Sequence, residues 1–205
     1  MLALLKRDFL LYFRNRSGVF FSLLGALISF LLYIIFLQKN LMDAWSQLPD
    51  NKSLLNNWLM GGTLAVTGIT TSFTALTQMV QDRENQVDQD LFLTDLGSWG
   101  LQLSYLISSL IISFVMQAFM LIVMSLYFQE IRAMSKLFEI SLIMLLSSLL
   151  STLVNALLIY HFQSVDSLGK LATIVGTASG FLVGTYVPMG ILPNFAQVLM
   201  KCTPA

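Results

Sequence analysis

The sequence predicts an all-α membrane protein whose helices form a polytopic transmembrane bundle. Of its 205 residues, 56% are hydrophobic and only 11% are charged, whereas soluble domains carry about 25% charged residues. The apolar residues gather in runs near the roughly 20 residues that a bilayer crossing needs. Lipid offers the backbone no hydrogen-bond partners, so each run must be a helix that satisfies its own backbone groups.

Five apolar runs are predicted to be the transmembrane helices, and together they occupy residues 18–187. They cover residues 18–37, 58–80, 101–128, 137–162 and 171–187. No linker or low-complexity segment separates them, so residues 1–205 are expected to form one membrane domain. The formal net charge of zero gives no indication of a nucleic-acid partner, and a single cysteine, Cys202, excludes an internal disulfide.

Residues 1–17, ahead of the first run, are predicted to form an interfacial helix along the inner leaflet, which Ser17 and Gly18 interrupt. One face of this helix carries Leu2, Leu5, Phe9, Tyr12 and Phe13. Arg7 and Arg14 lie across from that face. The alternative is an ordinary basic flank of the first transmembrane helix.

The distribution of basic residues orients the chain. Four of them, Lys6, Arg7, Arg14 and Arg16, precede the first run, whereas the loop between the first and second runs has only two, Lys39 and Lys52. The positive-inside rule therefore places the N-terminus in the cytoplasm. Loops 81–98 and 163–170 are then internal, and loops 39–57 and 129–136 are external.

Small and polar residues recur at helical spacing inside three of the runs. The second run carries Thr63, Thr67, Thr70, Thr74 and Thr77 on one face. The fourth run carries Ser141, Ser148, Thr152 and Asn155 on another. The threonine face is interpreted either as the lining of a translocation path or subunit interface, or as packing within one bundle. The fifth run carries Ala172, Gly176, Gly180 and Gly184, a stripe that favours close helix packing.

No catalytic, metal or nucleotide site is predicted on this chain. A phosphate-binding P-loop needs a serine or threonine after its Gly-Lys pair, but Leu171 follows Gly169 and Lys170. The predicted spans also lack ionisable residues near the midplane, which ion-driven carriers use for coupling. The chain is therefore not expected to be an enzyme by itself, and any transport must draw its energy from elsewhere.

The internal loop 81–98 combines charge with apolar residues, which suits a helix that docks into a groove of a cytoplasmic partner. The residues assigned to this contact are Arg83, Glu84, Asp88, Leu91, Phe92, Leu93 and Thr94. The alternative is a solvated loop that returns to the membrane through an interfacial turn.

Three features together resemble the transmembrane subunits of bacterial ABC-2 type exporters. They are the basic amphipathic segment 4–16, the Arg83-Glu84 pair followed by Leu91, Leu93 and Thr94, and the segment 187–193 followed by Thr203-Pro204. The last is similar to the family's re-entrant external hairpin, predicted here at 188–205. Asn85 and Asp95 depart from the glycine and proline that the family often has.

The resemblance implies a permease subunit in the bacterial cell membrane that binds no cofactor. A partner ABC ATPase would carry ATP and Mg²⁺, a second permease subunit, identical or homologous, would complete the path, and residues 82–95 would receive the ATPase movement. Members of the family have six spans, so a sixth helix is expected beyond Ala205.

The cargo is expected to be amphipathic or lipidic, such as a drug or antimicrobial peptide, because the spans offer hydroxyl and aromatic faces without fixed charge. The alternatives are export of a lipid-linked glycan and a membrane sensor or assembly protein that transports nothing.

Overall fold

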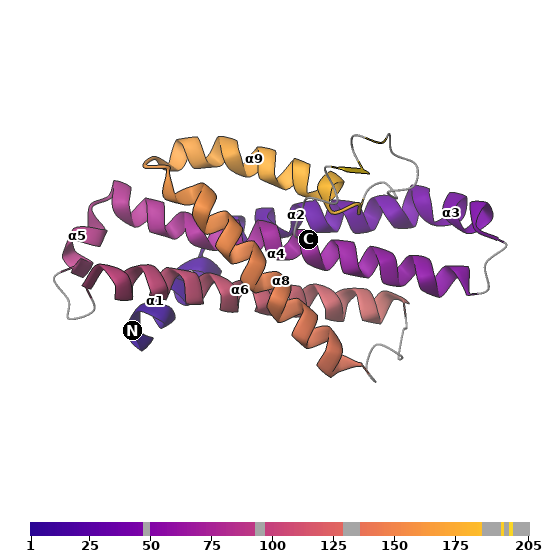
Figure 1. Cartoon of the computed structure of the whole chain (residues 1–205), viewed down its shortest axis with the longest axis horizontal. Coiled ribbons are helices and arrows are strands. Elements are labelled where there is room, and N and C mark those ends of the chain that lie inside the picture. Colours follow the sequence, from indigo (N-terminus) through magenta and orange to yellow (C-terminus); the bar gives the residue numbers. More distant parts are fainter. Residues whose placement is uncertain (47–49, 93–96, 129–135, 186–193, 195–196, 199–205) are drawn as a thin grey trace.

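The computed structural model describes residues 1–46, 50–92, 97–128, 136–185, 194 and 197–198, and every regular element in them is a helix (Figure 1). In order these are α1 Leu2–Arg14, α2 Arg16–Leu32, the π-helical turn η1 Tyr33–Leu37, α3 Gln38–Ala44, α4 Asn51–Glu84, α5 Val87–Phe92, α6 Gly97–Phe128, α8 Leu137–Tyr160 and α9 Val165–Leu182. The predicted all-α fold is confirmed. The predicted hairpin at 188–205 lies, except for residues 194, 197 and 198, outside the described residues.

Four helical stretches among the described residues are long and apolar enough to cross a membrane. They are Arg16–Asp43, Asn51–Glu84, Gly97–Phe128 and Leu137–Tyr160, which confirms a polytopic bundle. The helix expected at 171–187 begins earlier, at Val165, and ends at Leu182. It is less apolar than the four stretches above, because Asp166 and Lys170 lie in its first turns. A fifth crossing by α9 therefore stays a prediction.

The helices extend beyond the apolar runs, and the loops are correspondingly shorter than predicted. Most of the predicted external loop 39–57 is helical, because α3 ends at Ala44 and α4 begins at Asn51. With its 34 residues, α4 is about 51 Å long, against about 30 Å for the hydrocarbon core. Hydropathy marks only the part of a helix that lies in hydrocarbon, whereas the backbone ladder continues into the headgroup region and water.

The long helices alternate in direction (Figure 1). The end of α4, the short helix α5 and the turn between α8 and α9 gather at the same end of the molecule as α1. The starts of α4 and α8 lie at the opposite end. This alternation agrees with the predicted internal loops at 81–98 and 163–170, which share one side with the N-terminus.

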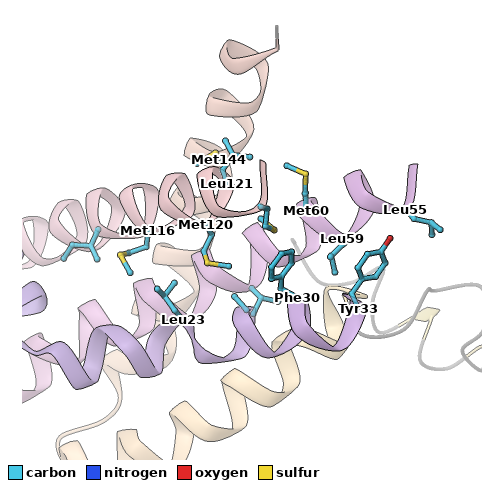
Figure 2. Packing of buried hydrophobic residues seen from close by; sticks show 14 of the residues in the cluster. Leu23, Phe30, Tyr33, Leu55, Leu59, Met60, Met116, Met120, Leu121 and Met144 are labelled. Carbon is cyan, nitrogen blue, oxygen red and sulfur yellow. The ribbon is translucent and has the colours of Figure 1, made fainter. Parts of the chain in front are cut away.

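The centre of the bundle is α4, which packs against α2, α6, α8 and α9. One apolar cluster joins α2, α4, α6 and α8 and is rich in methionine (Figure 2). Its fully buried members include Tyr33, Leu59 and Met120. A second cluster, built around Leu76, Val80 and Ile159, lies nearer the α1 end of the bundle.

The helix α1 is separate from the first span, as predicted, but its break and its buried face differ from the prediction. The break falls at Asn15, whose side chain accepts a hydrogen bond from the Gly18 amide and so caps α2. The face buried against the bundle carries Leu4, Asp8 and Tyr12, while Leu2 and Phe13, predicted to share the apolar face, are exposed. The prediction considered only an apolar face turned toward lipid, but α1 also packs against α6, where Asp8 finds polar partners.

Candidate functional site

The last turn of α4 ends in three consecutive charged residues, Asp82, Arg83 and Glu84, and each contacts a different part of the bundle. Asp82 faces α1 and α6, Arg83 reaches the end of α8, and Glu84 reaches the start of α9. We refer to residues 82–84 as the α4 terminus. It immediately precedes α5, so it joins the predicted partner-contact loop to the bundle.

Asp82 is the buried centre of a polar cluster between three helices. Both of its carboxylate oxygens accept from Nη2 of Arg7, each at 2.8 Å. The hydroxyl of Tyr105 donates to Asp82 at 2.5 Å, and the side-chain amide of Gln78 donates at 2.7 Å. Burial opposes the charge of Arg7, but its hydrogen bond to Asp82 and the charge of Asp82 outweigh burial and raise the pKa of Arg7. Asp82 thus fixes α1 and α6 to the end of α4.

Asp8 forms the second half of this cluster. Nη1 of Arg7 lies 3.2 Å from its Oδ1, and the hydroxyl of Ser108 donates to Oδ2 at 3.2 Å. Burial nevertheless raises the pKa of Asp8 to about 6, because the attraction of Arg7 and the Ser108 bond offset only part of the lost solvation. The nearby charge of Asp82 raises it further.

The free energy of unfolding is therefore expected to fall as the pH rises and Asp8 loses its proton. Because the Asp8 pKa is raised from 3.8 to about 6 on folding, the folded chain binds the proton more tightly, and the associated stability is present below pH 4 and lost by about pH 6. Two pKa units correspond to at most about 3 kcal/mol. Unfolding of the wild type and of Asp8→Asn in detergent at pH 4 to 7 checks this. The advantage of the wild type over the variant should shrink up to about pH 6 and stay constant above it. A pH-independent difference would contradict the expectation.

Arg83 and Glu84, which are predicted to contact a partner, bind the turn between α8 and α9 within the chain. Nη1 of Arg83 lies 3.4 Å from the carbonyl oxygens of both Tyr160 and Phe162, and its guanidinium lies 5.9 Å from the centre of the Tyr160 ring. The carboxylate of Glu84 accepts from the backbone amide of Val165 at 2.9 Å. These two side chains thus have partners within the chain.

The helix α5 follows after a tight turn in which Gln86 adopts a positive φ of 60°. Asp88 lies half-buried and Asp90 exposed in its first turn. Leu91, predicted to be an apolar anchor for a partner, is half-buried against the second apolar cluster of its own bundle. The side chain of Phe92 and residues 93–96, with Leu93 and Thr94, lie outside the described part of the chain. Of the assigned contact residues whose side chains are described, Asp88 is left on α5 without a role inside the bundle.

The threonine face of α4 divides into two parts. Thr63 and Thr67 are fully buried, whereas Thr70, Thr74 and Thr77 are half-buried. The hydroxyls of the last four threonines in this series donate to the backbone carbonyl one turn earlier. The first part therefore belongs to packing within the bundle, and the second part faces open space.

Two adjoining cavities occupy that space. One, of about 400 Å³, is lined by polar groups of α1 and α4 that include Asp8, Arg14, Thr77 and Gln81. The other, of about 470 Å³, lies between α2, α4 and α9 and is lined by Phe21, Ile28, Thr70, Phe73, Val175 and Gly176, among others. Gly18 and Thr74 line both. We call the pair the α2–α4–α9 groove, which is polar near α1 and mainly apolar deeper in the bundle.

The small-residue stripe of α9 is only partly used in packing. Gly180 and Gly184 are buried, whereas Ala172 and Gly176 are half-buried and line the groove. A Cβ added to Gly176 would meet nothing within 4 Å. A tight approach to α4 occurs just after the end of α9, where a Cβ on Gly62 would lie 2.5 Å from the Thr185 hydroxyl.

The polar face of α8 joins α8 to α4. Ser148, Thr152 and Asn155 are buried, and Asn155 donates to the Ile69 carbonyl at 2.8 Å and to the Ser72 hydroxyl at 2.7 Å. Ser141 instead donates to the carbonyl of Phe138, within α8. Sequence reasoning did not identify Gln117 of α6, which is fully buried and accepts from Ser148 at 3.2 Å.

The sequence model of a family described as ABC-2 type transporter matches residues 1–205. No curated protein and no solved structure matches the chain significantly. In the described residues, no group of three or more His, Cys, Asp or Glu side chains is placed to hold a metal ion.

Proposed function

Because the chain belongs to the ABC-2 type transporter family, we propose that it is the permease subunit of a bacterial exporter that moves an amphipathic or lipidic cargo. The family makes it a multi-pass membrane permease of an ABC transporter, a component that is not itself catalytic, and implies association with an ABC ATPase. The proposal adds the direction of transport, the kind of cargo, the bacterial cell membrane with a cytoplasmic N-terminus, and a second permease subunit.

The α2–α4–α9 groove is the observation that supports this cargo. Its polar part lies beside α1, where Arg14 and Gln81 are exposed, and its apolar part presents Phe21, Ile28 and Val175. A molecule with a polar head and an apolar body matches this gradient, because each part finds a surface of its own polarity. The hydroxyls of Thr70 and Thr74 bond within α4, so the groove wall is mildly polar and carries no fixed charge at that depth.

A second copy or a homologous subunit would supply the missing wall of the path. The groove is bounded by α2, α4 and α9 on one side only, and the half-buried Gly176 leaves room for a neighbour on α9. The exposed apolar side chains of Phe21 and Ile28 on α2 line the same face. They would pack against the partner permease or lipid.

The ATPase would bind ATP and Mg²⁺ and would dock at the α1 end of the bundle. The acidic first turn of α5 offers Asp88 and Asp90 to basic groups of such a partner. Asp90 is exposed, and within the described residues no ion pair of this chain engages it.

Charge reversal tests the docking surface. Asp90→Lys is expected to weaken binding of the ATPase at least roughly tenfold, because it would set like charges against each other across the interface. Asp43→Lys, the matched control, makes the same change on an exposed residue of α3 at the opposite end and should leave binding unchanged. The measurement is copurification in detergent with an ABC ATPase of the same organism, followed by ATP hydrolysis and cargo export in vesicles. If no ABC ATPase binds the wild-type chain, or the complex hydrolyses ATP but moves no amphiphile, the proposal fails.

A further inference from the structure

The turn between α8 and α9 leaves two sets of unsatisfied backbone groups close together. The last carbonyls of a helix and the first amides of the next have no partners inside their own helices. Ser164 occupies the N-cap position of α9, but its side chain makes no capping hydrogen bond. The first amides of α9 are therefore free to bond to an acceptor from another part of the chain or to water.

The α4 terminus supplies groups of the right charge to both helix ends. Glu84 accepts from the amide of Val165, the first residue of α9, at 2.9 Å, and Arg83 donates to the carbonyls of Tyr160 and Phe162 at 3.4 Å. An anion is favoured at a helix N-terminus and a cation at a helix C-terminus, because the peptide dipoles add up along the axis. The two neighbouring residues are thus matched to the two helix ends.

These contacts differ in kind from the neighbouring contact of Asp82. Asp82 is 3% exposed and its bonds to Arg7 measure 2.8 Å, so breaking that contact would leave a charge buried without its partner. Glu84 is exposed and the Arg83 bonds are long, so these contacts can break and reform in water at low cost. The last turn of α4 therefore makes a strong contact with α1 and α6, and a weak contact with the α8–α9 turn that can break and reform.

The weak contacts of Arg83 and Glu84 lie between the proposed ATPase-docking helix α5 and the α9 wall of the groove. On one side, only Asn85 and Gln86 separate Glu84 from α5. On the other side, Val165 begins the helix whose Ala172 and Gly176 line the α2–α4–α9 groove. A movement of α5 would therefore reach α9 through Glu84 and Arg83.

We infer that Arg83 and Glu84 are positioning residues that transmit displacement of α5 to the α8–α9 turn, and so move the α9 wall of the groove, without contacting the ATPase themselves. This inference rests on the proposed function. It assigns the docking contact to α5 and the transmission to the α4 terminus.

Three variants test the inference in the complete complex: Glu84→Ala, Glu84→Gln and the charge-loss control Asp43→Ala. Glu84→Ala should raise hydrogen exchange of the first amides of α9 about fivefold, the usual consequence of a lost N-terminal cap. It should leave ATPase binding intact and lower cargo exported per ATP by at least roughly tenfold. Glu84→Gln keeps an acceptor for Val165 and should restore most of both properties, and Asp43→Ala should change neither.

Each of the other outcomes contradicts one step of the inference. Loss of ATPase binding in Glu84→Ala would show that Glu84 is a partner contact. Unchanged exchange would show that the cap on α9 is not used in the membrane, and faster exchange with normal coupling would refute transmission. If the wild-type chain bound no ATPase, the proposed function would fail, while hydrogen exchange in the chain alone would still decide whether Glu84 holds α9.

Discussion

Replacing Arg7 with alanine is expected to destabilise the folded chain by about 3–5 kcal/mol, because a buried carboxylate would lose its cationic partner. Asp82 is 3% exposed, and without Arg7 it keeps only the donors of Tyr105 and Gln78. The matched control is Arg14→Ala, which removes the same charge from an exposed position of the same helix. Its effect should stay within about 0.5 kcal/mol.

The measurement is the free energy of unfolding in mixed micelles, titrated with a denaturing detergent. The double variant Arg7→Ala/Asp82→Ala removes both charges and should be less destabilised than the sum of the single variants, because Asp82 is no longer left buried without its cation. Equal effects of Arg7→Ala and Arg14→Ala would show that the pair between α1 and α4 contributes nothing to the fold.

The sequence predicted the helices well because hydropathy is a local property. Runs of apolar residues mark the spans directly, and the separate helix α1 follows from its own composition. The helix ends were placed less well, since polar residues such as Asn51 and Lys52 continue α4 into a region where lipid no longer selects apolar side chains. Hydropathy cannot record where a helix stops outside hydrocarbon.

The Arg7–Asp82 cluster could not be found from the sequence. Its two charged residues are 75 positions apart, and each has an ordinary local explanation, one as a basic residue near the cytoplasm and the other as part of a charged loop. Only the packing of α1 against α4 and α6 brings them together. Residues on one helix face recur at a known spacing, which predicts that they lie close together. No such spacing predicts a contact between two charged residues this far apart in the sequence.

In the predicted partner loop, the structure shows contacts within the chain that the sequence pattern did not indicate. Arg83, Glu84 and Leu91 are all engaged by the bundle itself, because helix ends and an apolar side chain next to a core find partners within the chain first. The threonine face illustrates the same limit. The helical period alone placed five threonines on one face, but the packing of α1, α2 and α9 decides which of them line the groove.

The crossing of α4 and α6 depends on Gly68, which sequence analysis did not identify. A Cβ at this position would lie 2.1 Å from Nε2 of Gln117. The Gln117 side chain is fully buried and bonds to Ser147 and Ser148 of α8. The hydroxyl of Ser113 donates to the Gly68 carbonyl at 3.1 Å. Gly68 therefore makes room for a polar contact that joins three helices in the middle of the bundle.

Gly68→Ala is expected to destabilise the bundle by about 1–2 kcal/mol, because it must push Gln117 away from its partners and leave a buried amide unsatisfied, while the better helix propensity of alanine offsets part of that cost. Gly61→Ala is the matched control on the same helix, where an added Cβ meets nothing within 4 Å. It should stabilise α4 by up to about 1 kcal/mol through better helix propensity.

Because the conflict in Gly68→Ala lies with one side chain, shortening that side chain should relieve it. The double variant Gly68→Ala/Gln117→Ala is therefore expected to be more stable than the sum of the two single changes, by about 1 kcal/mol or more. Unfolding of the four proteins in mixed micelles, each compared with the wild type, measures this difference. Strictly additive effects, or equal stability of Gly68→Ala and Gly61→Ala, would mean that α4 and α6 do not approach each other closely at Gly68. The contact between Gln117 and the α4 backbone would then not be what sets the spacing of the two helices.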